Sequence, residues 1–301
     1  MMYHYSAFGL SMQSDLAFSE LLSLEQESAG REANIKISAG YVNIPLDSEA
    51  LDNNWIFANK NIVYCHFKDI GRFCVERGTT ITYQLDLNAG IEDLKPYLLP
   101  LSLAIVAHQR GRIPLHLAAL KTSNGILLLT GVSGTGKSTV AAAASKQKYW
   151  PILCDDLAIF DPSAQPPCLH FPFNSIKLYE KTAFDQLELT NPLRPRYASE
   201  MKFHFSIPTQ NSIPLNQVKN LVLLKWGQDF EMVRQSQTAG FTALMNSLVL
   251  PLLVGPNETT NIIRTSILSA AALMSTYDVT RNKDDDASLN LVIENLASIT
   301  Q

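Results

Sequence analysis

The chain of 301 residues has few of the features that mark metal-binding, disulfide-rich or membrane proteins. Its four cysteines show no C-x-x-C spacing and no paired histidines, which argues against a zinc site or a disulfide framework and favours a reducing compartment. The longest apolar stretches, Tyr97–Ala107 and Phe241–Val254, are interrupted by proline or polar residues and fall short of the ~18–20 residues that span a bilayer. The first residues lack the basic start and apolar core of a signal peptide, so we expect a cytoplasmic protein.

Charge is also scarce. Charged residues make up 17% of the chain and the formal net charge is −4, so nothing favours nucleic acid or an anionic membrane as a partner. Hydrophobic residues make up 46%, a composition typical of a folded globular protein with a substantial core. The sequence contains no internal repeat and no low-complexity segment.

One stretch, Gly125–Thr139, carries the strongest functional signal. Its apolar run Ile126–Leu129 predicts a buried strand, and the helix-forming run Val140–Ala144 follows it. Between them, Gly131–Ser138 fits the pattern G-x-x-x-x-G-K-[ST]. A strand before and a helix after are the context that a phosphate-binding loop needs, and the alternative is a glycine turn with a solvated lysine.

The residue types of this loop suit nucleotide binding. Glycines allow a close approach of the backbone, and successive N–H groups at a helix start form an anion site. Lys137 supplies a charge to the β and γ phosphates, and the Ser138 hydroxyl can bind Mg²⁺. The residues expected to bind ATP are Gly131, Ser133, Gly134, Thr135, Gly136, Lys137, Ser138 and Thr139. The motif alone does not define what happens to the γ-phosphate.

A second strand, within Trp150–Phe160, contains the adjacent acids Asp155 and Asp156. Carboxylate oxygens suit Mg²⁺, and a carboxylate beside the γ-phosphate can accept the proton of an acceptor hydroxyl. Adjacent residues of a strand point to opposite faces, so one aspartate could face the metal and the other the acceptor. The alternative is a charged turn between two strands.

Other polar residues are weaker candidates. His116 lies in a predicted strand, Ile113–Leu120, which we expect to form a hairpin with the strand before the loop. Cations that could contact a phosphate or an acceptor are Lys177, on a predicted strand Ser175–Tyr179, and the cluster of Arg194, Arg196 and Lys202. For each of these cations, ordinary surface charge is the alternative.

The pattern of apolar residues predicts an α/β protein in two parts. Residues 1–110 form a β-rich N-terminal region, and residues 111–301 form the domain that carries the loop. The expected strands are 33–38, 62–67, 71–76, 80–85, 113–120, 126–129, a run within 150–160 that ends at the two aspartates, 175–179, 218–226 and 275–280. The expected helices are 14–23, 91–110 with a break near Pro100, 137–148, 238–253, 258–277 and 287–299.

The sequence resembles the HPr serine kinase/phosphorylase family, and more closely the HPr-kinase-like proteins encoded with lasso-peptide biosynthesis enzymes. The short separation between the loop and the paired aspartates is the feature that separates this family and the phosphoenolpyruvate carboxykinases from common ATPases and GTPases. The stretches that carry the resemblance are Ala7–Leu10 with Ser14-Asp15, His108–Gly111 through Leu115-His116, the loop GVSGTGKST with ILCDDLAIF, and Phe171-Pro172 through Ile176–Leu178.

The resemblance implies a role for each matching residue. Lys137 would hold the β and γ phosphates, and Ser138 would bind Mg²⁺ together with Asp156. Asp155 would be the general base, with His116 close to the catalytic site. The chain departs from the family pattern at Thr139, where HPr kinases have Glu, and on strand 175–179, where Ser175 and Lys177 replace a Glu and an Arg. These departures weaken the case for a second metal position and for reverse phosphorolysis, so kinase activity alone is expected.

Together the motifs and the resemblance imply an ATP- and Mg²⁺-dependent kinase with an HPr-kinase/phosphoenolpyruvate-carboxykinase-like core. The expected acceptor is a serine of a peptide or small protein, above all a lasso precursor peptide, which the N-terminal region would help to bind. The resemblance also raises the prospect of a homo-oligomer, because HPr kinases assemble as hexamers. The alternatives are a kinase of an HPr-type carrier protein or of a small-molecule hydroxyl, and a nucleotide-gated binding protein without phosphoryl transfer.

Overall fold

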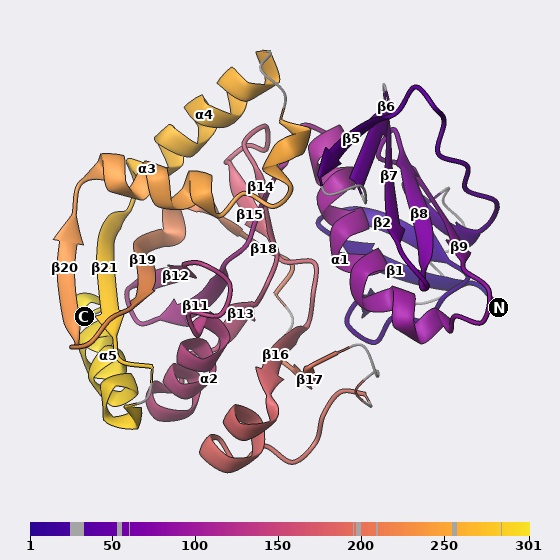
Figure 1. Cartoon of the computed structure of the whole chain (residues 1–301). Helices are drawn as coiled ribbons and strands as arrows, with labels where there is room; N and C mark the ends of the chain where they lie inside the picture. The colour runs from indigo at the N-terminus through magenta and orange to yellow at the C-terminus, as the bar shows by residue number, and fades with distance from the viewer. Residues whose placement is uncertain are drawn as a thin grey trace.

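The computed structural model describes residues 1–24, 33–52, 56–59, 61–194, 196, 200–208, 210–254, 258–283 and 285–301. These residues form a mixed α/β fold with four β-sheets (Figure 1). The predicted α/β class is therefore confirmed. In the described part of the chain, no helix combines the length and the apolar character needed to cross a bilayer.

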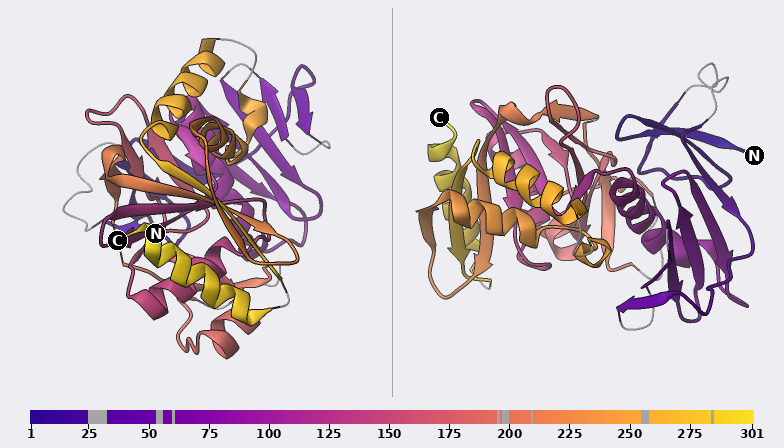
Figure 2. Two further views of the ribbon diagram at one scale, coloured as in Figure 1. Left: turned by 90° about the vertical axis from the view of Figure 1, so that its left-hand side faces the viewer. Right: turned by 90° about the horizontal axis from the view of Figure 1, so that it is seen from above.

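The first nine strands form one sheet in the order β3-β1-β2-β4-β9-β8-β7-β6-β5. Helix α1 (Ile91–Gln109) packs against it through fully buried leucines such as Leu94, Leu98 and Leu103. The same core includes Ile159 from the rest of the chain, so α1 lies between the N-terminal sheet and the remaining sheets (Figure 2). The strands are β1 (Tyr3–Ala7), β2 (Leu10–Ser14), β3 (Leu22–Ser23), β4 (Ile35–Ala39), β5 (Glu49–Asp52), β6 (Ile56–Asn59), β7 (Ile62–Phe67), β8 (Gly71–Glu76) and β9 (Thr80–Leu85).

Two predictions for this region are wrong. The segment 14–23 is not a helix, because the Ser14 hydroxyl accepts a hydrogen bond from the Leu16 N–H at 2.9 Å and the Phe18 N–H donates to the Tyr5 hydroxyl at 2.8 Å. Helix α1 also continues through Pro100 without a break. An interior proline costs a helix about 3 kcal/mol. Each buried leucine contributes ~1.5–3 kcal/mol, so the packed face of α1 outweighs that cost.

A six-stranded sheet carries the predicted phosphate loop, in the order β13-β11-β12-β19-β21-β20. Strands β12, β19 and β21 are parallel, and the outer strands run antiparallel to their neighbours. Helices α3 (Gln237–Asn246) and α4 (Glu258–Ala271) cover one face, whereas α2 (Lys137–Lys148) and α5 (Asp286–Ile299) cover the other. The strands are β11 (Ala118–Thr122), β12 (Gly125–Thr130), β13 (Ile152–Cys154), β19 (Val218–Trp226), β20 (Glu231–Gln235) and β21 (Ser275–Arg281).

The predicted hairpin before the loop is confirmed, since β11 pairs antiparallel with β12 from Ala118↔Leu129 to Thr122↔Gly125. The predicted strand 113–120 is wrong, because it is divided between two sheets, and Asp155 and Asp156 lie in a turn between two strands and not on a strand. Residues 113–120 form β10 (Ile113–Leu115) and β11, and residues 150–160 form β13 and β14 (Ala158–Asp161). The breaks have local causes: the His116 N–H donates to the Ser247 carbonyl at 2.7 Å, and Asp156 has a φ of +77°.

Strands β10 and β14 belong to a four-stranded sheet with β15 (Cys168–His170) and β18 (Ser212–Pro214). The fourth sheet is the pair β16 (Ser175–Tyr179) and β17 (Lys202–Ser206), with the π-helical turn η2 (Lys181–Gln186) after β16. The 3-10 turns η3 (Leu215–Gln217) and η4 (Pro251–Leu253) complete the described elements.

Two predicted helices are too long. The helix predicted over 238–253 is α3, which ends at Asn246, and the helix predicted over 258–277 is α4, which ends at Ala271 before β21 begins.

Candidate active site

The loop Gly131–Ser138 joins β12 to α2, as the sequence predicts. Gly131 has a φ of +144° and Gly136 a φ of +86°, conformations that L side chains rarely adopt. A Cβ at Gly131 would lie 2.6 Å from the Leu224 carbonyl oxygen, and one at Gly136 would lie 2.5 Å from Arg281 Nη2. Gly131 is therefore required by backbone conformation and by space, and Gly136 by backbone conformation, since the Arg281 side chain can move.

Lys137 is the first residue of α2 and is buried, with 6% of its surface exposed. Its Nζ donates to the Gly131 carbonyl at 2.8 Å and lies 3.4 Å from the Val132 carbonyl. Burial lowers the pKa of Lys137 below its ordinary value, whereas Asp155 and Asp156 raise it. The side chain thus lies along the inside of the loop with its cationic end held by the loop's own carbonyl groups.

Asp155 lies at the base of the site, with 3% of its surface exposed. Its Oδ1 accepts a hydrogen bond from the Ser138 hydroxyl at 2.9 Å, and its Oδ2 accepts one from the Lys177 backbone N–H at 3.0 Å. Burial is the main reason that the pKa of Asp155 is raised, and the neighbouring Asp156 adds to it. This carboxylate therefore joins the loop to strand β16.

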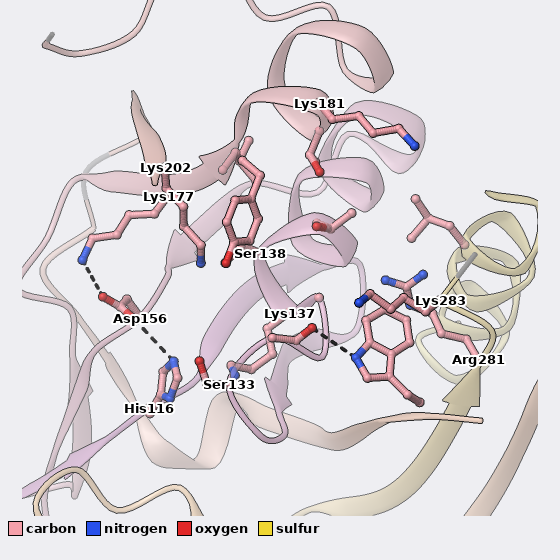
Figure 3. A pocket seen from close by; sticks show the side chains of 18 residues that line it. His116, Ser133, Lys137, Ser138, Asp156, Lys177, Lys181, Lys202, Arg281 and Lys283 are labelled. Atoms are coloured by element: carbon pink, nitrogen blue, oxygen red, sulfur yellow. Dashed lines mark hydrogen bonds and ion pairs between the residues drawn. The ribbon is translucent and has the colours of Figure 1, made fainter. Parts of the chain in front are cut away.

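Asp156 lines the pocket beside the loop, on the same side of Lys137 as His116 (Figure 3). Its Oδ2 lies 2.6 Å from Lys177 Nζ, and its Oδ1 lies 3.4 Å from His116 Nε2. Burial alone would raise the pKa of Asp156, but Lys177 and His116 hold it well below its usual range. The carboxylate is therefore ionised and held between two nitrogen donors.

The pocket has a volume of about 360 Å³ and is strongly cationic. Asp156 is the one acidic residue among the described residues that line it. Figure 3 shows His116, Asp156 and Lys177 on one side of Lys137, with Arg281 and Lys283 on the other. The Lys and Arg side chains that line the pocket are Lys137, Lys177, Lys181, Lys202, Arg281 and Lys283. Such a set suits a ligand that carries several negative charges.

Strand ends explain how the sheet positions part of this pocket. Trp226 at the end of β19 is paired with Arg281 at the end of β21, and the loop follows the neighbouring parallel strand β12. The Trp226 indole N–H donates to the Gly134 carbonyl at 3.2 Å, and the Arg281 guanidinium lies 4.2 Å from the centre of the indole ring. Ligands of open α/β sheets bind at the carboxyl ends of such strands, a rule that could have identified Trp226 and Arg281 from the predicted strands.

The structure brings most of the sequence-predicted residues together. His116, Lys137, Asp156, Lys177 and Lys202 line the pocket, together with the loop residues Ser133, Gly134, Gly136, Ser138 and Thr139. Thr135 is buried, with its hydroxyl donating to the Val132 carbonyl at 2.8 Å. Sequence reasoning missed Lys181, Trp226, Arg281 and Lys283.

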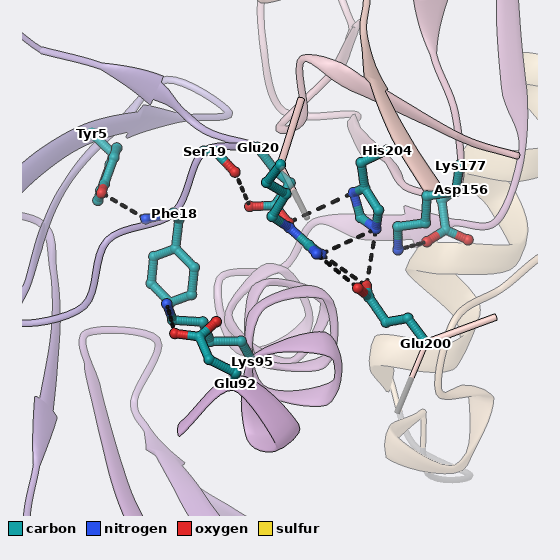
Figure 4. Close-up of polar contacts among 11 residues, drawn as sticks. Tyr5, Phe18, Ser19, Glu20, Glu92, Lys95, Asp156, Lys177, Glu200 and His204 are labelled. Carbon is teal, nitrogen blue, oxygen red and sulfur yellow. Dashed lines mark hydrogen bonds and ion pairs between the residues drawn. The ribbon is translucent and has the colours of Figure 1, made fainter. Parts of the chain in front are cut away.

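Two predicted cations lie elsewhere. Arg194 has a buried side chain in a charge cluster, where its guanidinium contacts Glu20 at 2.7 Å and Glu200 at 2.7 and 2.8 Å. Glu20 and Glu200 are labelled in Figure 4. His204 belongs to the same cluster, with Nε2 3.0 Å from Glu200 Oε1. Arg196 is exposed, and its guanidinium lies 5.2 Å from the centre of the Phe203 ring.

The side chains near the loop provide only some of the oxygen ligands that a hard cation such as Mg²⁺ needs. Among the described residues, no group of three or more His, Cys, Asp or Glu side chains could hold a metal ion. Mg²⁺ in nucleotide sites takes one or two protein oxygens and completes its shell with phosphates and water. Ser138 and Asp155 are in direct contact, whereas Asp156 contacts His116 and Lys177. The hydroxyl and carboxylate of Ser138 and Asp155 are ligands of the right chemistry.

Comparison with known proteins gives distant likenesses to solved structures. No protein-family model matches the chain, and no curated protein matches its sequence. The chain is similar to the solved structure of the Hpr(Ser) kinase/phosphatase from Coxiella burnetii, with 11% identity and a TM-score of 0.30. The alignment covers 62% of this chain and 88% of that one, and at this TM-score the two folds correspond only loosely.

Proposed function

We propose that this protein is a kinase that transfers the γ-phosphoryl group of ATP, with Mg²⁺, to a serine hydroxyl of a peptide or small protein. The observation that carries the proposal is the position of Asp156, an ionised carboxylate held by Lys177 and His116 in a cationic pocket next to the phosphate-loop motif. A nucleotide-binding site needs the loop, but only a transfer site needs an acceptor for a hydroxyl proton beside it.

The donor would be held by the loop. Backbone N–H groups between Gly131 and Ser138, at the positive end of α2, favour phosphate oxygens. Lys137 would exchange its contact with the Gly131 carbonyl for the β and γ phosphates. Mg²⁺ supplies charge neutralisation between phosphate oxygens when bound.

The contacts favour a division of labour between the two aspartates that differs from the one implied by the sequence resemblance. Asp155 contacts the Ser138 hydroxyl and is buried, which suits a metal ligand at the base of the site. Asp156 lines the pocket, which suits the group that orients the acceptor hydroxyl and accepts its hydrogen bond. In a largely dissociative transfer the proton leaves late, so an ionised, well-positioned carboxylate matters more than a high pKa.

Lys177 and His116 would position Asp156 and neutralise charge on the transferred group. Lys202 lies on β17 and lines the same pocket, so it is a further cation for phosphate or acceptor. We assign residues 111–301 to catalysis and propose that the β-rich region of residues 1–110 helps to bind the acceptor. The sequence resemblance supports a lasso precursor peptide as that acceptor and a homo-oligomeric assembly.

The proposal is tested by incubating the protein with labelled ATP, Mg²⁺ and candidate acceptors, followed by mass spectrometry of the products. The acceptors are a lasso precursor peptide, an HPr-type carrier protein and small-molecule alcohols. A phosphoserine on the peptide, absent with Lys137→Ala, is the expected result. Tight ATP binding without transfer to any acceptor would instead support a nucleotide-gated binding protein.

A further inference from the structure

The pocket beside the loop has two ends of different chemistry. One end holds Asp156, His116 and Lys177, and Lys177 also lines a separate cavity of about 20 Å³ within the charge cluster. Beside the other end lies a second hollow of about 570 Å³ between α2, η2 and α5. Thr139, Thr182 and Leu289 line both the pocket and this hollow, so the two spaces are adjacent.

The loop fixes which way a triphosphate would lie. Backbone N–H groups of such a loop hold the α and β phosphates, and the lysine reaches the β and γ phosphates. The γ-phosphate must lie toward Asp156, where a hydroxyl can attack in line. The α-phosphate then lies toward Thr139, and whatever is attached to it leaves the pocket on that side.

The residues on that side suit a nucleoside. Leu289 of α5 is half-buried and offers an apolar surface to a flat base. The Thr182 hydroxyl and the exposed Asp185 carboxylate of η2 are hydrogen-bonding partners for a ribose or an exocyclic amine. Arg281 and Lys283 lie on the side of Lys137 away from Asp156 and add positive charge to that part of the pocket (Figure 3).

We propose that the hollow between α2, η2 and α5 is the nucleoside subsite of this protein, with the base of a nucleoside triphosphate packed on Leu289. The inference rests on the proposed function, because it needs a triphosphate on the loop. It adds to that function the preference for a nucleotide over an inorganic polyphosphate. The cavity within the charge cluster is too small for a nucleoside, so the space beside Asp156 is left to the acceptor.

The test compares the binding of MgATP with that of inorganic tripolyphosphate by calorimetry. Tripolyphosphate reports on the loop alone, and ATP reports on the loop and the hollow together. Leu289→Ala should weaken ATP binding about tenfold and leave tripolyphosphate binding unchanged, because it removes apolar surface and adds no charge to the pocket. Leu291→Ala is the matched control, because Leu291 lies on the same helix, is 42% exposed and lines neither space.

Equal loss of both ligands' affinity in Leu289→Ala, or no loss of either, would overturn the subsite while leaving the kinase proposal in place. Failure of the unmodified protein to bind either ligand would overturn the proposed function itself. Photolabelling with 8-azido-ATP gives a second measurement that needs no substitution. The expected label lies on η2 or α5, and a label confined to the segments around His116 or Lys177 would contradict the proposal.

Discussion

Lys177 contacts both aspartates of the site, through its backbone N–H to Asp155 at 3.0 Å and through its side chain to Asp156 at 2.6 Å. A single residue of β16 therefore fixes the positions of two carboxylates with opposite pKa shifts. The backbone contact survives any substitution other than proline, so the two contacts can be separated by mutation.

We expect Lys177→Met to reduce phosphoryl transfer by about 10²-fold, because it removes a positioned cation but keeps the backbone contact. Burial would then raise the pKa of Asp156 without the opposing charge of Lys177. Asp156 is active when ionised, so the acid limb of the rate profile should move to higher pH. Rates measured between pH 4 and 8 check this, and Lys177→Arg is the control that keeps the charge. An unchanged pH profile in Lys177→Met would contradict the pairing.

Substitution of each aspartate should give a different defect. Asp156→Asn is expected to reduce transfer by ~10²–10⁴ while MgATP binding is retained, because the group that orients the hydroxyl is lost. Asp155→Asn is expected to raise the Mg²⁺ concentration needed for activity, because it alters the partner of Ser138. Steady-state rates at varied Mg²⁺ and calorimetric ATP binding separate the two. The reverse pattern would restore Asp155 as the base, as the sequence resemblance implies.

Lys137→Ala should abolish the stabilisation of the protein by ATP. A ligand present at 100 times its Kd stabilises the folded state by ~2.7 kcal/mol, which appears as a rise in melting temperature. The measurement is a thermal unfolding scan with and without MgATP. Lys148→Ala, at the other end of the same helix and exposed, is the control that should keep the full rise. A rise that survives Lys137→Ala would argue against the loop as the phosphate site.

Arg194 should matter for stability and not for phosphate binding. Its guanidinium lies between Glu20 and Glu200, so Arg194→Ala leaves two buried carboxylates without their cation. Removal of one partner of a buried ion pair costs ~3–5 kcal/mol, whereas an exposed substitution such as Arg196→Ala costs less than about 0.5 kcal/mol. Urea unfolding of both variants measures the difference. Equal stabilities would show that the cluster contributes nothing.

Because of the same cluster, we expect the stability of the protein to depend on pH in the acid range. Burial alone would raise the pKa of Glu200, but His204 and Arg194 lower it from 4.5 to about 2. A depressed carboxyl pKa contributes stability above its unfolded value, and this stability is lost as the pH falls from 4.5 toward about 2. The free energy of unfolding should therefore decrease across that window. Glu200→Gln should flatten the decrease, which unfolding curves at several pH values will show.

The sequence predicted correctly those elements that are marked by a local pattern of apolar or helix-forming residues. The bounds of β7, β8, β9, β16, β19 and α2 agree with the predicted 62–67, 71–76, 80–85, 175–179, 218–226 and 137–148. Predictions failed where a distant contact decides the backbone. The sequence predicts residues 113–120 as one strand, because no local pattern indicates that the His116 N–H donates to Ser247. It favours Asp155 and Asp156 as strand residues, whereas the structure has the alternative, a turn between β13 and β14 with Asp156 at a positive φ.

In the candidate site, too, residues marked by a local pattern were predicted and those placed by distant contacts were not. The loop, the aspartates, His116 and Lys177 could be found from residue types in a short pattern, since each lies at the end or side of a predicted strand. Arg194, Arg196 and Lys202 lie close together in the sequence, yet of these three only Lys202 lines the pocket. Arg194 instead forms an ion pair with Glu20 of the N-terminal region. Such a choice between partners depends on tertiary contacts that no local pattern records.

The chain passes from one sheet to another at His116 and again at Asp156, and this has a consequence for folding. The contact between the two residues depends on both sheets, so we expect it to form after them. Contacts between residues far apart in sequence carry a high loop-closure cost and form slowly. We therefore expect catalytic activity to return after the bulk of secondary structure during refolding, which makes activity a reporter of complete assembly.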